Sequence, residues 1–220
     1  RQNPTRFAEL VFGIQLTDHQ KWMILSSWVP STVVWLCSRA TGKSFMASVF
    51  LMLRSLLLAN TNSYIMRPSG QQSQETFTKM EDIAKKNIAS LSGTTDIFFN
   101  ECMRMNSMAD PFTHSKQGYT VSLYNGSTIN SLNSVAKNIV GIRSSCSVYD
   151  EAGKITRDYY ALTLPFTVQS TDFITGTGIN SEIYPKQLPN KNIFLSSAEG
   201  IDSYLFDMYK LCYEKMLLGD

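Results

Sequence analysis

A short polar turn at residues 37–44 could bind the phosphates of a nucleotide. It reads Cys-Ser-Arg-Ala-Thr-Gly-Lys-Ser and ends in the Gly-Lys-Ser/Thr signature of phosphate-binding turns, although Cys37 stands where the general pattern has glycine. Such chemistry needs inward-pointing backbone N–H groups at the positive end of a helix. Gly42 would let the backbone approach a phosphate, Lys43 would reach the β- and γ-phosphates, and the Ser44 hydroxyl would bind Mg²⁺. We therefore expect ATP and Mg²⁺ as ligands here.

The segments on either side of this turn have the patterns of a strand and a helix. Residues 32–37 form a continuous apolar run with β-branched side chains, which is typical of a strand covered on both faces. Residues 43–59 are mostly apolar and have the length of a helix. A phosphate-binding turn must lie between a strand and a helix, so this context argues against a chance Gly-Lys-Ser.

Two adjacent carboxylates, Asp150 and Glu151, follow a second short apolar segment. Ligands bind at the carboxyl ends of the strands in parallel sheets. Asp150 would hold Mg²⁺ through water, and Glu151 would orient or deprotonate the water that attacks the γ-phosphate. A solvated acidic pair at a strand end is the competing interpretation. We expect Lys43 and Glu151 to face one triphosphate across the tips of neighbouring strands.

The remaining segments predict how this site is held. Two alternating segments flank Asn125-Gly126, which indicates a β-hairpin over residues 118–132. Further strands are expected at residues 62–67, 173–177 and 192–196, and helices at residues 71–91 and 202–218. Alternating strands and helices predict an α/β fold, here a P-loop NTPase of the ASCE type with a mostly parallel central sheet flanked by helices. We divide the chain into an N-terminal arm, residues 1–30, and an ATPase core, residues 31–220.

Composition narrows the class of protein. The chain has 220 residues, with 20 lysines and arginines against 18 acidic residues, so its net charge of +2 gives no argument for nucleic-acid binding. Four cysteines without a Cys-x-x-Cys spacing, and only two histidines, argue against structural zinc and a disulfide framework. The most apolar stretch, residues 45–58, is shorter than a membrane span and is interrupted by Arg54. We expect a globular protein of a reducing compartment, with no membrane segment.

Together these motifs resemble those of phage terminase large subunits, the ATPases that package DNA. Residues 38–44 match the family's variant phosphate-binding turn, in which Arg39 takes a place that the general motif leaves open and the first glycine is often missing. Residues 1–7 and 16–20 are similar to the family's opening and to its adenine-binding segment. The resemblance runs over nearly the whole chain, and its most specific part is the Arg-containing turn combined with Asp150 and Glu151.

The resemblance implies roles for individual residues. The residues that would contact ATP are Gln20, Ser38, Arg39, Ala40, Thr41, Gly42, Lys43 and Ser44. The metal ligands would be Ser44 and Asp150, and the catalytic residues would be Glu151, Lys43, Arg143 and Arg39. A coupling motif would be formed by Ser196, Ser197 and Ala198, on a strand beside that of the phosphate-binding turn.

Two of these arginines have more than one interpretation. Arg143 resembles the arginine finger that one subunit supplies to its neighbour, where a guanidinium would offset the charge that develops on the γ-phosphate. A surface ion pair is its simpler interpretation. Arg39 could supply the same charge within its own subunit, or switch between phosphate and a neighbour, and the sequence leaves these alternatives open.

The resemblance also implies partners. They are double-stranded DNA, a homo-oligomeric ring on a portal, pentameric in the family, and the small terminase subunit, in the cytoplasm of the infected bacterial host. Basic residues that could grip a DNA backbone, or simply be solvated, are Lys79, Lys85, Lys86, Arg104, Lys116 and Lys137. Terminase large subunits also carry a C-terminal nuclease domain, which we do not expect in this chain, and we assign it no nuclease activity.

The function that this pattern favours is an ATP-hydrolysing motor that translocates double-stranded DNA into a procapsid. A helicase or restriction-type DNA translocase would share both motifs and is the main alternative. A P-loop kinase would need an arginine-rich lid and would not need Glu151 to activate water. A nucleotide-gated binding module would not need Glu151 either.

Overall fold

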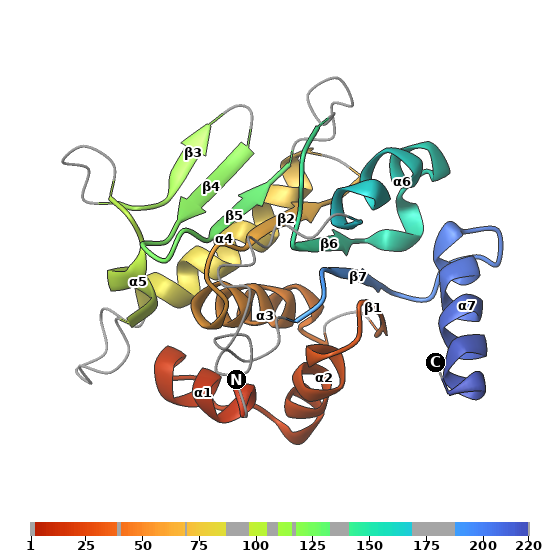
Figure 1. Cartoon of the computed structure of the whole chain (residues 1–220), viewed down its shortest axis with the longest axis horizontal. Helices are drawn as coiled ribbons and strands as arrows, with labels where there is room; N and C mark the ends of the chain where they lie inside the picture. The colour runs from red at the N-terminus through yellow and green to blue at the C-terminus, as the bar shows by residue number, and fades with distance from the viewer. Residues whose placement is uncertain are drawn as a thin grey trace, which may run out of the picture.

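The strands of this chain form a single sheet in the part that the structure describes (Figure 1). The computed structural model describes residues 3–38, 41–68, 70–86, 97–104, 110–115, 118–132, 141–168 and 188–219. The seven strands lie in the order β1-β7-β6-β2-β5-β4-β3. The first five in that order run parallel: β1 (Thr32–Leu36), β7 (Lys191–Ser196), β6 (Cys146–Asp150), β2 (Asn62–Met66) and β5 (Thr128–Ser131). The antiparallel strands β4 (Gly118–Ser122) and β3 (Thr113–Ser115) complete the sheet. The mostly parallel α/β prediction is confirmed.

Helices cover both faces of this sheet. The α-helices are α1 (Pro4–Phe12), α2 (Asp18–Trp28), α3 (Lys43–Leu57), α4 (Gly70–Lys86), α5 (Ile97–Glu101), α6 (Arg157–Thr163) and α7 (Tyr204–Leu218). Two 3₁₀ turns, η3 (Ala152–Lys154) and η4 (Leu164–Thr167), flank α6. Consecutive strand residues point to opposite faces. On β7, Ile193 packs with α1–α5 in one core, whereas Phe194 packs with α6, α7 and the 3₁₀ turns in the other.

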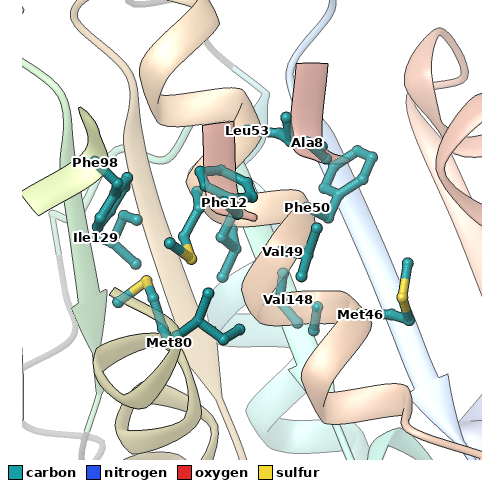
Figure 2. Packing of buried hydrophobic residues seen from close by; sticks show 14 of the residues in the cluster. Ala8, Phe12, Met46, Val49, Phe50, Leu53, Met80, Phe98, Ile129 and Val148 are labelled. Carbon is teal, nitrogen blue, oxygen red and sulfur yellow. The ribbon is translucent and has the colours of Figure 1, made fainter. Parts of the chain in front are cut away.

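The larger core surrounds α3 (Figure 2). Ten consecutive residues of α3, Met46–Ser55, are buried, because the sheet lies on one side of the helix and α1 and α2 lie on the other. The Phe50 ring packs edge-to-face with Trp28 and Trp35, at centroid distances of 5.7 and 6.1 Å. A helix that is apolar all round is a buried helix, which explains the apolar stretch seen in the sequence. Among the described residues, no helix is long and apolar enough to cross a bilayer.

The hairpin prediction is also confirmed. Strands β4 and β5 pair antiparallel, and the turn between them contains Gly126 at φ +82°. The Asn125 carboxamide accepts a hydrogen bond from the Ser127 N–H at 3.0 Å and donates one to the carbonyl of Ser55 at 2.7 Å. A Cβ at position 126 would lie 2.2 Å from the Asn60 Oδ1 atom, so both the turn and the packing require glycine there.

Other expectations need correction. The strands that carry the two motifs, β1 and β6, are not neighbours, because β7 pairs with both and separates them. Strand β1 lies at the lateral edge of the described sheet; Val33 packs against one core and Val34 against the other, so both of its faces are covered as predicted, although only Trp35 is fully buried. The short elements α5, β3 and α6 were not predicted, and the strand expected at residues 173–177 lies outside the described residues.

Candidate nucleotide-binding site

Six of the predicted site residues line an open pocket at the carboxyl ends of β1, β7 and β6. The pocket has a volume of about 460 Å³, within the size range of small-molecule sites. It is lined by Thr41, Gly42, Lys43, Ser44, Lys79, Glu151, Lys154, Ser197 and Glu199. Lys43 and Glu151 therefore face the same space, as predicted, although a third strand lies between the strands that carry them.

The phosphate-binding turn ends where α3 begins. Gly42 has a left-handed backbone, with φ +81° and ψ +22°, and its carbonyl accepts the first helical hydrogen bond from Met46 at 2.9 Å. A Cβ on Gly42 would meet nothing within 4 Å, so the glycine is required by its backbone conformation rather than by lack of space. The Lys43 ammonium donates to the carbonyls of Cys37 and Ser38 at 3.3 and 3.4 Å. Arg39 and Ala40 lie outside the described residues.

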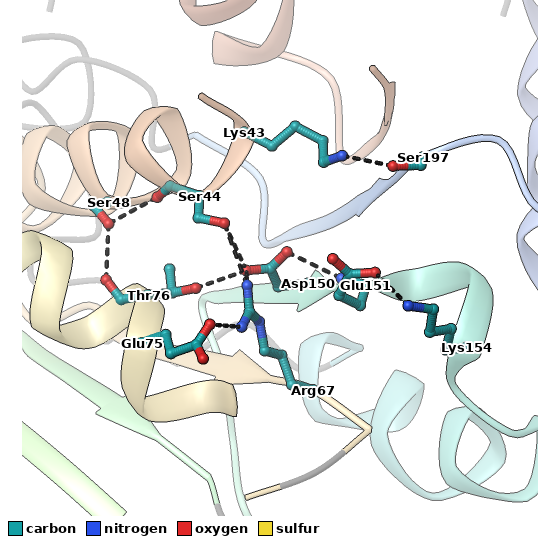
Figure 3. Close-up of polar contacts among 10 residues, drawn as sticks. All are labelled: Lys43, Ser44, Ser48, Arg67, Glu75, Thr76, Asp150, Glu151, Lys154 and Ser197. Carbon is teal, nitrogen blue, oxygen red and sulfur yellow. Dashed lines mark hydrogen bonds and ion pairs between the residues drawn. The ribbon is translucent and has the colours of Figure 1, made fainter. Parts of the chain in front are cut away.

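The predicted coupling segment joins the two halves of the site (Figure 3). Ser197 Oγ accepts a hydrogen bond from the Lys43 ammonium at 2.9 Å, and the Ser196 carbonyl accepts the Cys37 N–H at 3.1 Å. On the other side, Ser196 Oγ accepts the N–H of Gly153 in η3 at 3.2 Å. The expectation that this segment lies beside the strand of the phosphate-binding turn is confirmed, whereas Ala198 is merely exposed.

The proposed metal ligands, Ser44 and Asp150, lie next to each other. Ser44 Oγ is 3.2 Å from Asp150 Oδ2, and the Asp150 side chain is 1% exposed. The Thr76 hydroxyl donates to the same carboxylate oxygen at 2.6 Å. A hydroxyl and a carboxylate are hard oxygen donors of the kind that Mg²⁺ prefers, so the residues present fit that ion.

A residue that the sequence did not point to completes this cluster. Arg67 follows β2 and is 5% exposed, and its Nη2 atom contacts Asp150 Oδ2 and also lies 3.3 Å from Ser44 Oγ. Its Nη1 atom lies 3.0 Å from an oxygen of Glu75 on α4 (Figure 3). A charged residue at the carboxyl end of a predicted strand of a parallel sheet is the signal that could have identified Arg67. Nothing comparable marks Thr76 or Glu75, which read as polar positions of a helix.

The proposed catalytic carboxylate has an unusual backbone. Glu151 adopts φ +56° and ψ +40°, a left-handed conformation that is uncommon outside glycine. Its N–H donates to Asp150 Oδ1 at 3.0 Å, and its carboxylate lies 3.3 Å from the Lys154 ammonium. Both side chains line the pocket, so Lys154 is a further cation within reach of a bound phosphate.

Other predicted residues lie away from the pocket. Gln20 forms a capping box with Thr17, accepting the Thr17 N–H at 3.0 Å, and is not among the pocket-lining residues. Arg143 is exposed and precedes β6, at the opposite edge of the sheet from Asp150. Among the candidate DNA-binding residues, Lys79 lines the pocket instead.

The other basic candidates are engaged locally or lie outside the described residues. Lys85 forms ion pairs of 2.5 Å with both Glu81 and Asp110. The Arg104 guanidinium lies over the ring of Phe99. The side chain of Lys86, and all of Lys116 and Lys137, are outside the described part of the chain.

The cysteines have no chemistry in this site. All four are free thiols, and burial raises the pKa of Cys102 to about 12 and also raises the pKa of Cys146. Thiols with raised pKa values are poor nucleophiles at neutral pH. Within the described ranges, no group of three histidine, cysteine or acidic residues could hold a metal ion.

The fold was compared with those of known proteins. The sequence matches no family model and no curated protein. Among solved structures, the ATPase domain of the Thermus phage P74-26 large terminase is 16% identical with a TM-score of 0.60, over 95% of this chain and 75% of that one. The HK97 bacteriophage large terminase is 13% identical with a TM-score of 0.70, over 98% of this chain and 41% of that one. The chain thus spans less than half of that whole terminase. Its fold is that of phage large terminase ATPase domains, and at this level the resemblance seen in the sequence is confirmed.

Proposed function

We propose that this chain is the ATP-hydrolysing motor domain of a viral terminase large subunit, which translocates double-stranded DNA into a procapsid. The observation that carries the proposal is that Lys43, Ser44 and Glu151 line one pocket of a terminase ATPase fold, with Asp150 in contact with Ser44. In this role the domain acts in the host cytoplasm as part of a homo-oligomeric ring on a portal, together with the small terminase subunit.

The residues of the pocket divide the chemistry between them. Lys43 would exchange its hydrogen bonds to Cys37, Ser38 and Ser197 for the β- and γ-phosphates. Ser44 and Asp150 would hold Mg²⁺, which supplies positive charge to the phosphates when it is bound. Glu151 would accept a proton from the attacking water or orient it, since its carboxylate lines the same pocket.

The hydrogen bonds of the coupling segment connect the phosphate-binding turn to the turn that follows Glu151. Ser197 contacts Lys43, and the adjacent Ser196 contacts the turn that follows Glu151. When Lys43 turns towards phosphate, Ser197 loses its bond, and the change reaches β7 and through it η3. We propose that this strand transmits the state of the nucleotide to the rest of the ring.

Arg143 fits a role in the neighbouring subunit. It lies three residues before β6, at the amino end of the strand whose carboxyl end carries Asp150. Its side chain is exposed at the opposite edge of the sheet, so it serves a pocket other than its own. We propose that it is the arginine finger, acting in trans. The role of Arg39 stays open, because its position is not described.

The test is a mixing experiment. Arg143→Ala keeps an intact pocket but offers no finger, whereas Glu151→Gln offers a finger but has a disabled pocket. Each variant alone should be inactive in steady-state ATP hydrolysis, and their mixture should regain part of the wild-type rate, increasing more than linearly with protein concentration. Double-stranded DNA should raise the rate further. A mixture that stays as inactive as its components would show that Arg143 does not act in trans.

A further inference from the structure

We propose that Arg67 is an internal counter-ion that occupies the metal side of Asp150, and that Mg²⁺ must displace it onto Glu75 before a nucleotide is fully bound. This inference rests on the proposed function, because it takes Ser44 and Asp150 as the metal ligands. It makes Arg67 a positioning residue and gives the empty and loaded sites different arrangements of charge.

Arg67 lies where the proposed Mg²⁺ ion would bind. A single guanidinium nitrogen of Arg67, Nη2, contacts both Ser44 Oγ and Asp150 Oδ2, the two oxygens assigned to the metal site (Figure 3). A Mg²⁺ ion or one of its bound waters between these oxygens would need the space that this nitrogen occupies. Two cations cannot share that space, because like charges repel strongly where water is excluded. The metal and the guanidinium therefore exclude each other.

Asp150 is buried, so its negative charge needs compensation. A carboxylate that is 1% exposed is costly unless a cation or hydrogen-bond donors compensate its charge. Thr76 and the Glu151 N–H supply neutral donors, and Arg67, itself 5% exposed, supplies the positive charge. The empty site is thus already compensated, and Mg²⁺ replaces one cation by another instead of filling a bare negative site.

Arg67 also forms an ion pair with a second carboxylate. Glu75 is 65% exposed, and its Oε2 atom lies 3.0 Å from Arg67 Nη1. Arg67 can therefore release Asp150 and keep an acceptor, moving from a buried partner towards an exposed one. In the empty site, α4 is linked to Asp150 of β6 in two ways, directly through Thr76 and indirectly through Glu75 and Arg67. Release of Asp150 by Arg67 would leave only the direct contact.

The experiment titrates Mg²⁺ at a fixed ADP concentration and follows the melting temperature and the heat of binding, without hydrolysis. Arg67→Met should lower the half-saturating Mg²⁺ concentration by about tenfold, since one charge-assisted contact no longer competes. Mg²⁺ should also raise the melting temperature of this variant more than that of the wild type. Arg67→Lys, which keeps a charge, should return the midpoint most of the way to wild type.

A second variant tests the same idea from the exposed side. Glu75→Gln leaves Arg67 with a weaker alternative acceptor, so the half-saturating Mg²⁺ concentration should rise by about threefold. Because Glu75 is exposed, this variant decides the question even if Arg67→Met does not fold. Arg157→Met, which breaks the exposed pair with Asp207 at 2.7 Å, is the matched control and should leave the midpoint unchanged.

Asp150→Asn separates the two proposals. It should remove the Mg²⁺ response, and if it does so while Arg67→Met and Glu75→Gln keep the wild-type midpoint, the counter-ion proposal is overturned and the metal assignment stands. If Asp150→Asn responds to Mg²⁺ like the wild type, Asp150 is not the metal acid. The proposed function then loses its metal site, and the inference fails with it.

Discussion

Two buried cations lie at opposite ends of the strands of the same sheet, and their partners differ in kind. We call these two ends of the sheet its carboxyl edge and its amino edge. At the carboxyl edge, Arg67 contacts the carboxylates of Asp150 and Glu75. At the amino edge, Lys191 begins β7 with 0% exposure, and its ammonium donates to the backbone carbonyl of Pro30. Burial, together with the neighbouring charge of Arg54, lowers the pKa of Lys191 to about 8.

This difference shows what each edge of the sheet can do. A carboxylate neutralises a buried cation and can exchange it for another, such as a metal ion. A backbone carbonyl accepts a hydrogen bond without cancelling the charge, so Lys191 remains costly to bury and has nothing to exchange. We therefore expect substitutions at the carboxyl edge to change activity, and substitutions at the amino edge to change stability.

The largest expected effect is at the carboxyl edge. Glu151→Gln should lower the rate of ATP hydrolysis by about 10²–10⁴, the usual contribution of a general base, while ATP binding and the melting temperature stay near wild type. Single-turnover hydrolysis and calorimetric binding measure the two effects separately. Glu199→Gln, which changes the other carboxylate that lines the pocket, is the matched control and should remain active. A normal rate in Glu151→Gln would remove Glu151 from the mechanism.

At the amino edge the effect should fall on stability. Lys191→Met should raise the free energy of unfolding at pH 7 by about 1–3 kcal/mol, because the cost of burying a charge exceeds the lost bond to the Pro30 carbonyl. ATP hydrolysis should be unchanged. Urea denaturation measures the effect, with the surface substitution Lys21→Met as the control. A less stable Lys191→Met protein would mean that the carbonyl partner outweighs the charge.

The same lysine predicts a pH dependence. Unfolded lysine keeps its proton up to about its ordinary pKa of 10.5, whereas folded Lys191 loses it near 8, so unfolding takes up a proton between these values. A rise in pH therefore disfavours unfolding, and the free energy of unfolding should increase by about 1 kcal/mol between pH 8 and 9. Comparing the wild type with Lys191→Met cancels the ionisable groups that do not interact with this lysine; the Cys146 thiol, whose pKa is raised by burial and lowered by Arg54 and Lys191, does not cancel. Parallel pH profiles for the two proteins would contradict the prediction.

The smallest expected effect lies again at the carboxyl edge. Ser197→Ala removes one charge-assisted hydrogen bond from the Lys43 ammonium, which keeps the carbonyls of Cys37 and Ser38 as acceptors. Because Lys43 would give up this bond when it binds phosphate, we expect kcat/KM for ATP to rise by about threefold to tenfold. Ser26→Ala on α2 is the control and should leave kcat/KM unchanged. A wild-type value for Ser197→Ala would leave the coupling segment without a measurable contact to the phosphate-binding turn.

The sequence predicted the parts of the site that depend on local pattern. The turn ending in Lys43 and Ser44 and the pair Asp150-Glu151 are recognisable because their chemistry requires fixed spacings beside a strand. The strands and helices around them also follow from the spacing of apolar residues. Their predicted ranges agree with the structure to within a few residues, except that α4 is described only to residue 86 and the strand expected at residues 173–177 lies outside the described residues.

What could not be predicted depends on which strands become neighbours. The resemblance placed β7 beside β1, but no local pattern shows that β7 also pairs with β6 and so separates the strands of the two motifs. Arg67 reaches Asp150 because β2 pairs with β6 in the register that sets Met66 opposite Tyr149. That pairing is a tertiary property, as is the contact of Thr76 with the same carboxylate.

The left-handed backbone at Glu151 affects how substitutions at positions 150 and 151 can be interpreted. This backbone is held by a hydrogen bond to one oxygen of Asp150, while the other oxygen of Asp150 faces Ser44. A substitution at position 150 therefore alters the metal side and loosens the peptide that carries the proposed base, even though residue 151 is untouched. Double substitutions at these two positions should consequently be strongly non-additive, and neither single variant measures the contribution of one carboxylate alone.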